Sequence, residues 1–196
     1  YCGRLLKSKG INIFLDLLKE YSSSRGLVFG DIDPSSKDSL SLENLDDFSK
    51  TLNNVTFHGN IQDPLLNVKD NFPILIVPSD YGEGLSRSIL EALSLRIPVI
   101  SSQSSLCGIF TNDYLYYPEF NNYENYMEII AKLIKNYRNN KLRKILDKGF
   151  EKVVNEFTEE KIVDSTISIY DDLLDKNNSS YLISKRDLKE SFWLAQ

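Results

Sequence analysis

The chain has 196 residues, 41% of them hydrophobic, which is enough to bury a core and argues against a disordered segment. Its net charge of −5 argues against a general nucleic-acid binder, whose affinity depends on many Lys and Arg contacts to phosphate. No apolar run approaches the roughly 20 residues that span a bilayer, and two cysteines are too few for a disulfide framework, so we expect a cytoplasmic protein.

A basic loop follows the first three residues. Residues 1–3 are typical of the end of a strand, and the chain lacks an initial Met, so we expect a fragment whose first strand is truncated. Arg4 and Lys9 lie in the loop between Gly3 and Gly10. A phosphate-binding loop needs fixed positive charge and close backbone approach, although a solubilising loop has the same composition.

The next elements lead to a pair of acidic residues. Apolar residues at helical spacing predict a helix over residues 11–18, and a strand is predicted over residues 26–30. The strand ends in Asp31 and Asp33, which can hold Mg²⁺ or Mn²⁺ against a diphosphate or form a polar turn closed by Pro34. We favour the turn, and we expect neither a metal nor a cofactor.

A helix and a short strand come next. The apolar pattern predicts an amphipathic helix over residues 39–53, which includes Leu42, and a strand over residues 55–57. His58 follows directly and is the only histidine of the chain. A lone histidine at a strand end is more often structural than catalytic, so we assign it no chemical role.

The central stretch, residues 73–102, predicts a strand, loop, helix and strand. The runs 74–77 and 97–100 are short, apolar and β-branched, as in parallel strands that are covered on both faces. Between them, apolar residues at helical spacing end on Ala92 and Leu93 and form one stripe. The loop from Ser79 therefore lies at the carboxyl end of a strand, where open α/β sheets bind ligands.

Two glutamates of this stretch are separated by two steps of four residues. They are Glu83 and Glu91, and Arg87 lies four residues from each of them. Both carboxylates can then address one ligand that lies along the start of the helix. The alternative is a solvated ladder of ion pairs, each contributing about 0.2–0.5 kcal/mol. The spacing alone favours the ladder.

The last third of the chain predicts a final strand and three helices. The strand is expected over residues 114–117, and Thr158 is a candidate N-cap for the third helix. Residues 177–180 are typical of a linker, and residues 181–196 form a tail with Leu188, Phe192 and Trp193 on one side of a predicted helix. Such a tail contacts a partner surface, either the missing half of the protein or a membrane.

Two motifs resemble those of the retaining glycosyltransferases of family four (group 1), which have the two-domain GT-B fold. Residues 83–93, EGLSRSILEAL, are similar to the E-x7-E signature of that family. Residues 3–10, GRLLKSKG, are similar to a G-R-L-x-x-x-K-G run at the start of the second domain. The resemblance covers most of the chain and implies that residues 1–176 form the nucleotide-sugar-binding domain, the C-terminal half of the fold.

The resemblance implies a doubly wound, Rossmann-like α/β domain with about six mostly parallel strands and helices on both faces. It also implies roles for individual residues. Arg4 and Lys9 would contact the donor diphosphate, and Glu83 would lie by the donor sugar, as the catalytic residues. Glu91 would hold the ribose hydroxyls. The other substrate-binding residues that it implies are Gly3, Gly59, Ile61, Ser79, Gly84, Leu85 and Ser86.

The implied activity is transfer of a sugar from a nucleoside-diphosphate sugar, with retention, to a glycan, lipid-linked or other acceptor. The implied context is cell-surface polysaccharide synthesis. The acceptor would bind through the missing N-terminal domain, with a peripheral contact to the membrane, and the fragment alone would be inactive. Residues 102–109 depart from the family, because they keep one glycine where many relatives have a Gly-Gly turn and a Glu.

Two alternatives remain open from the sequence. One is a nucleotide-sugar-binding domain without catalytic activity. The other is a dinucleotide-dependent oxidoreductase domain, which would share the fold class. The absence of a G-x-G-x-x-G fingerprint in the sequence counts against the second alternative.

Overall fold

The structure is a computed structural model that describes residues 1–82, 84–119, 121–136 and 140–176. Contacts divide the chain into two units, Tyr1–Asn155 and Glu156–Gln196. The predicted linker and tail, residues 177–196, lie outside the described residues. The predicted domain boundaries therefore stay a prediction.

Parallel strands form the framework of the first unit. The described strands are β1 (Gly26–Phe29), β2 (Val55–Gly59), β3 (Leu75–Val77) and β4 (Val99–Ser101). β1 pairs with β2 and β3 pairs with β4, in both cases in parallel. Single parallel bridges join Cys2 to Phe29 and Ile100 to Tyr116. The predicted α/β class is thus confirmed, with two strand pairs and two bridging segments among the described residues.

The predicted strand over residues 114–117 is reduced to one bridging residue. Tyr116 donates its N–H to β4 and accepts an N–H from it, each over 3.0 Å. The N–H groups of Leu115 and Tyr117 bond instead to residues of the preceding turn. Extension of the ladder with β4 would use the next residues on the same side of the strand, Tyr114 and Pro118. The Tyr114 N–H bonds to the Thr111 carbonyl over 3.0 Å, and Pro118 has no N–H, so the pairing stays a single bridge.

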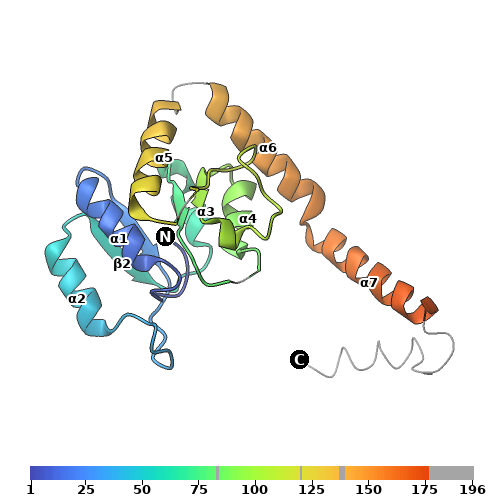
Figure 1. Cartoon of the computed structure of the whole chain (residues 1–196), viewed down its shortest axis with the longest axis horizontal. Coiled ribbons are helices and arrows are strands. Elements are labelled where there is room, and N and C mark those ends of the chain that lie inside the picture. Colours follow the sequence, from blue (N-terminus) through green and yellow to red (C-terminus); the bar gives the residue numbers. More distant parts are fainter. Residues whose placement is uncertain (83, 120, 137–139, 177–196) are drawn as a thin grey trace. The chain divides into compact units, whose positions relative to one another are not determined.

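Helices surround the strands in the first unit (Figure 1). They are α1 (Ile11–Glu20), α2 (Leu42–Thr51), α3 (Pro64–Val68), α4 (Arg87–Ser94), α5 (Tyr123–Asn136) and α6 (Asn140–Glu156), with the 3-10 turns η1 (Lys69–Asn71) and η2 (Gln103–Ser105). α2 packs beside β2, α4 packs against β3 and β4, and α1 packs against α5. The chain therefore winds between strands and helices, as a doubly wound fold requires.

The helices confirm most of the predicted apolar stripes. The apolar stripe of α1, Ile11, Phe14, Leu15 and Leu18, is buried, and in α4 Ile89, Ala92 and Leu93 have no exposed surface. α2 differs, because Leu42 is 71% exposed while Leu45 and Phe48 pack against the core. Leu42 follows the N-cap Ser41 directly, so it lies in the first turn, at the end of the apolar stripe.

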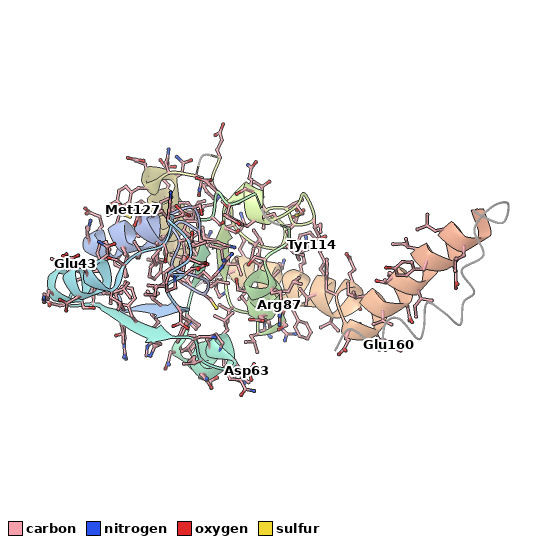
Figure 2. All side chains as sticks on the ribbon, turned by 90° about the horizontal axis from the view of Figure 1, so that it is seen from below. Glu43, Asp63, Arg87, Tyr114, Met127 and Glu160 are labelled. Atoms are coloured by element: carbon pink, nitrogen blue, oxygen red, sulfur yellow. The ribbon has the colours of Figure 1, made fainter. Side chains whose placement is uncertain are left out.

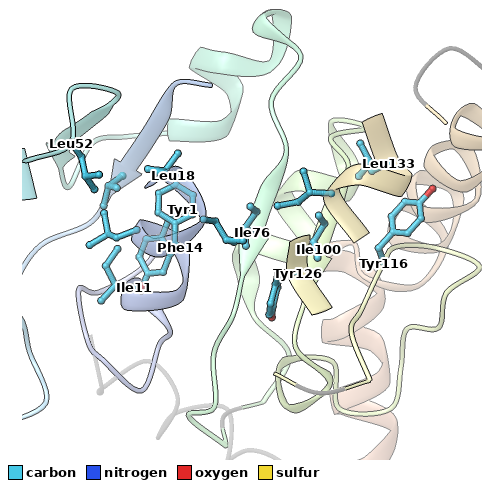
Figure 3. Packing of buried hydrophobic residues seen from close by; sticks show 14 of the residues in the cluster. Tyr1, Ile11, Phe14, Leu18, Leu52, Ile76, Ile100, Tyr116, Tyr126 and Leu133 are labelled. Carbon is cyan, nitrogen blue, oxygen red and sulfur yellow. The ribbon is translucent and has the colours of Figure 1, made fainter. Parts of the chain in front are cut away.

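One hydrophobic core joins the two strand pairs (Figure 3). Phe14 and Leu18 of α1 lie on one side of Ile76, and Ile100 and Leu133 lie on the other (Figure 3). Ile76 belongs to β3 and Ile100 to β4, so the second strand pair connects α1 to α5 through buried contacts. The loops at the ends of these strands therefore extend from the same hydrophobic core.

The described part of the second unit is α7 (Glu159–Lys176). The Lys161 N–H donates to the Thr158 hydroxyl over 3.4 Å, in agreement with the predicted N-cap. Among the helices that the structure describes, none combines the length and the apolar character needed to cross a membrane.

Candidate functional site

The basic loop runs from the first parallel segment to the start of α1. The Gly3 N–H donates to Phe29 in β1 over 2.9 Å, and the Leu5 N–H donates to the Asp31 carbonyl over 3.0 Å. The loop closes at Gly10, the N-cap of α1, whose φ of 76° lies in the left-handed region that favours glycine. The loop thus leaves the carboxyl end of a parallel segment and enters a helix, as a ligand-binding loop of such a fold does.

Asp38 fixes the middle of the basic loop. Its carboxylate accepts the Ser8 N–H over 3.0 Å and also accepts the Ser8 hydroxyl. The Lys7 N–H donates to the Asp38 carbonyl over 2.9 Å. The hydroxyl and amide bonds from Ser8 hold the pKa of the Asp38 carboxyl below its usual range. The backbone on the N-terminal side of Lys9 is therefore anchored to a second segment of the chain.

The basic loop lies directly against the loop that follows β3. The Asp80 N–H donates to the Ser8 carbonyl over 2.8 Å. The Lys9 ammonium lies 4.9 Å from the centre of the Tyr81 ring, a distance typical of a cation–π contact. The structure thereby brings Lys9 to the same loop as Ser79. Glu83, which belongs to that loop in the sequence, lies outside the described residues.

The start of the loop after β3 is buried and hydrogen-bonded. Ser79 is 1% exposed, and its carbonyl accepts the hydroxyls of Ser102 and Ser104. Both serines belong to the segment that departs from the family pattern. Ser102 is buried and Ser104 is exposed, and both hydroxyls bond to the loop, so this segment supports the position of Ser79.

α4 begins after the exposed Gly84. Ser86 is its N-cap, but the Ser86 hydroxyl bonds to the Ser88 hydroxyl over 2.9 Å and does not cap a backbone amide. Leu85 and Ser86 are partly buried. The first N–H groups of a helix have no partner inside it, so the uncapped start of α4 suits an anion that lies along the loop.

Glu91 is half-exposed on α4, and its ion pair is loose. One carboxylate oxygen lies 3.8 Å from a guanidinium nitrogen of Arg87, which is itself 92% exposed. Figure 2 shows the position of Arg87 on α4. The pKa of the Cys2 thiol is raised, chiefly by burial and in addition by the Glu91 carboxylate, against an opposing effect of the terminal amino group.

Arg4 pairs with an acid at the end of β1. Its guanidinium lies 2.9 Å from the Asp33 carboxylate, and its side chain is 52% exposed. Hydrogen bonds from Ser35, more than the Arg4 guanidinium, hold the pKa of Asp33 below its usual range. Exposed pairs of this kind contribute about 0–1 kcal/mol, so the guanidinium can exchange this carboxylate for another anion at little cost.

Gly59 lies at the same strand end as Asp31. The Gly30 N–H donates to the Gly59 carbonyl over 2.8 Å, and the Asn60 N–H donates to the Asp31 carboxylate over 3.2 Å. Ile61 follows and is 37% exposed. The Asp31 carboxylate thus accepts a hydrogen bond from the backbone. The described residues hold no group of three or more His, Cys, Asp or Glu side chains that suits a metal ion.

The predicted site residues form two neighbouring groups. Gly3, Arg4 and Gly59 surround the end of β1, while Lys9 and Ser79 meet at the end of β3. These groups share the basic loop, while the side chain of Glu91 pairs with Arg87 on α4. No described contact joins the Arg4 side chain to α4, because it pairs with Asp33.

Several partners of these residues are not indicated by any sequence motif. They are Tyr81 beside Lys9, Asp33 beside Arg4, Asp38 beneath Ser8, and the two serines on Ser79. Tyr81 comes four residues after the predicted strand 74–77, so the sequence placed it in the loop that was expected to bind the ligand. This position was the one sequence signal for any of these partners. The others depend on contacts between distant segments.

Two large grooves lie elsewhere on the first unit. Their volumes are about 1040 and 560 Å³, and both are lined by Phe72, Pro73 and Ile74, which precede β3. None of the predicted site residues that the structure describes lines either groove. Because ligands of open α/β sheets bind at the carboxyl ends of the strands, we place the candidate site at the loops and not in these grooves.

The family model described as "Glycosyl transferases group 1" matches residues 1–153. No curated protein sequence matches the chain. Among solved structures, a glycosyltransferase from Rickettsia africae ESF-5 is similar, with a TM-score of 0.76 and 21% identity over 88% of this chain and 46% of that one.

Two further solved structures share the fold. Anabaena Alr3699/HepE in complex with UDP-glucose has a TM-score of 0.69 and 18% identity over 85% of this chain and 47% of its own. The C-terminal domain of LpcC, a glycosyl transferase group 1 family protein from Francisella tularensis, has a TM-score of 0.64 and 23% identity over 80% of this chain and 84% of its own. The chain thus spans about half the length of the first two structures and most of the third, which is a C-terminal domain.

Proposed function

The chain belongs to the glycosyl transferases group 1 family, and on this premise we propose that it binds a nucleoside-diphosphate sugar as the donor-binding half of a retaining glycosyltransferase. The observation that carries the proposal is the contact between the Lys9 ammonium and the loop after β3. It brings a fixed cation to the loop that leads into the uncapped start of α4. An anionic diphosphate fits between two such groups.

In this proposal the diphosphate is bound by charge and by backbone amides. Lys9 and Arg4 stabilise the negative charge that grows on the departing diphosphate, as preorganised cations do. Arg4 turns from Asp33 toward the ligand, because an exposed ion pair opposes the change only weakly. The N–H groups of residues 84–86 meet the phosphates and the sugar.

The nucleoside lies across the ends of β1 and β2. Glu91 accepts the ribose hydroxyls with its half-exposed carboxylate. The backbone around Gly3 and Gly59, with the exposed Ile61 side chain, lies against the base. Ser79 supports the loop between the nucleotide and the sugar. The complex of Alr3699/HepE with UDP-glucose supports a nucleotide sugar as the ligand class.

The proposed reaction replaces the bond between the anomeric carbon and the diphosphate oxygen with a bond to an acceptor oxygen on the same face of the sugar. Glu83 positions the sugar, and no metal ion takes part because Lys9 and Arg4 neutralise the leaving group. We propose a hexose or related sugar as the group transferred and a glycan or lipid-linked acceptor held by a further domain. Such transfer fits cell-surface polysaccharide synthesis at the cytoplasmic side of a membrane.

A melting-temperature screen tests this function. A ligand that binds the folded chain stabilises it by RT ln(1 + [L]/Kd), or about 2.7 kcal/mol at a concentration of 100 Kd. We expect one member of a panel of UDP, GDP and ADP sugars to raise the melting temperature, and NAD to leave it unchanged. A shift with NAD alone would assign the chain to dinucleotide binding, and no shift with any sugar nucleotide would refute the proposal.

Replacing Glu91 with alanine is expected to reduce affinity for that ligand by about 10-fold or more, since hydrogen bonds to a charged group contribute roughly 1.5–3 kcal/mol. Titration calorimetry measures the change. Arg87→Ala is the matched control, because it removes the partner of the loose ion pair and keeps the carboxylate. Equal affinity in the Glu91→Ala variant and the unmodified chain would show that Glu91 belongs only to the ladder of ion pairs.

A further inference from the structure

Asn121 links the core to the loop after β3. Its side-chain amide nitrogen donates to the Pro78 carbonyl over 3.1 Å and to the Asp80 carboxylate over 2.6 Å. Its side-chain oxygen accepts the Tyr126 hydroxyl over 2.8 Å. Both polar atoms of the Asn121 side chain thus form hydrogen bonds. Both bonds from the nitrogen go to the loop after β3, which contacts Lys9.

Tyr126 holds the other end of this amide from the core. The side chain has no exposed surface, and burial, together with the Asp80 carboxylate, raises the pKa of its hydroxyl. The hydroxyl therefore stays protonated and donates its hydrogen to Asn121. The Pro78 carbonyl and the Asp80 carboxylate only accept hydrogen bonds, so they require the amide nitrogen on the side of the loop. The amide oxygen therefore lies on the side of Tyr126, where it accepts the hydroxyl.

The first part of the loop is held from three sides. Asn121 bonds to Pro78 and Asp80, the Ser8 carbonyl accepts the Asp80 N–H, and serine hydroxyls of the η2 segment bond to Ser79. Beyond Tyr81 the surroundings open, since a Cβ placed on Gly82 or Gly84 would meet nothing within 4 Å. The fixed part thus ends where the proposed donor contacts begin.

We propose that Asn121 is a positioning residue for the donor, an inference that rests on the proposed function. By holding Pro78 and Asp80 it keeps Tyr81 against Lys9 and sets the direction in which the loop enters α4. A loop that is already ordered loses less conformational freedom when a ligand binds, so affinity is higher. Asn121 itself touches neither the diphosphate nor the sugar.

Asn121→Asp tests the role through pH. The substitution replaces the donating nitrogen with an oxygen beside Asp80, so two carboxylates face each other at neutral pH. Such pairs repel, and they share one proton when the pH falls, because one pKa of the pair is raised. We expect donor affinity to be about 10-fold lower than in the unmodified chain at pH 7.5 and to recover by pH 5. Asp80 and Tyr126 are the titratable groups that bond to this side chain or face it.

The control is Asn125→Asp, which introduces the same charge at the start of α5, where Asn125 bonds to Asn122 and not to the loop. Its donor affinity is expected to match the unmodified chain at both pH values. Tyr126→Phe gives a second variant, which keeps the buried ring and removes the hydroxyl that holds the amide oxygen. It is expected to weaken donor binding without recovery at pH 5.

Hydrogen exchange separates failure of this inference from failure of the proposed function. In the ligand-free chain, Asn121→Asp is expected to accelerate exchange in residues 79–82 at pH 7.5, while Asn125→Asp leaves it unchanged. If the unmodified chain binds a sugar nucleotide and Asn121→Asp binds it equally at pH 7.5, the positioning role is wrong. If the unmodified chain binds no sugar nucleotide, the proposed function fails and the donor role fails with it, whatever the exchange shows about the loop.

Discussion

Replacing Lys9 with alanine is expected to weaken binding of the nucleoside-diphosphate sugar by about 10- to 100-fold, because a charge-assisted hydrogen bond contributes roughly 1.5–3 kcal/mol. The Lys9 ammonium lies beside Tyr81, at the junction of the basic loop and the loop after β3. The neighbours of Lys9 cannot move into its place, since Ser8 is bonded to Asp38 and Gly10 is the N-cap of α1. Titration calorimetry with the preferred donor measures the loss.

Lys7→Ala is the matched control for Lys9→Ala. Lys7 lies two residues away in the same loop and is exposed. Both variants lower the net charge by the same amount, so a difference between them reports the position of Lys9. We expect Lys7→Ala to change affinity less than about 3-fold, with the change disappearing at high salt, as for screened surface charges. Similar losses in both variants would assign the effect to general charge and contradict the account.

Gly10→Ala is expected to lower the free energy of unfolding by about 3 kcal/mol or more. A left-handed backbone at a residue with a Cβ costs about 1–2 kcal/mol, and overpacking adds about 1–3 kcal/mol. Gly10 has a φ of 76°, and a Cβ there would lie 1.9 Å from the Pro78 carbonyl oxygen. Urea denaturation followed by circular dichroism measures the change.

The comparison for Gly10→Ala is Gly82→Ala in the same pair of loops. A Cβ at Gly82 would meet nothing within 4 Å, so the substitution is expected to change stability by less than about 0.5 kcal/mol. The contrast tests whether the basic loop truly rests on the chain after β3. If Gly10→Ala were as stable as Gly82→Ala, the two loops would not be in contact.

The sequence alone predicts the central unit well, because its signals are local. β3, α4 and β4 follow from two apolar runs and one helical stripe, and Ile89, Ala92 and Leu93 are buried as the period requires. The segment around Tyr116 was harder to predict, since its single bridge depends on the Tyr114 amide, which bonds within the preceding turn. Leu42 shows a similar limit, because a first-turn residue can satisfy the period and still be exposed.

For the candidate site, the sequence indicated the charged and glycine residues but not their partners. Lys9 follows from the motif, whereas Tyr81 beside it depends on how two loops meet. Asn121 and Asp80 are 41 residues apart, and Arg4 and Asp33 are 29 apart. Contacts over such separations are set by the packing of the strands, which no local spacing encodes.

A crystal structure of the chain with its preferred sugar nucleotide tests the central claim most directly. The account predicts that the diphosphate lies within hydrogen-bonding distance of the Lys9 ammonium and that the ribose hydroxyls reach the Glu91 carboxylate. A nucleotide bound instead in the grooves lined by Phe72, Pro73 and Ile74, at the other ends of the strands, would contradict it.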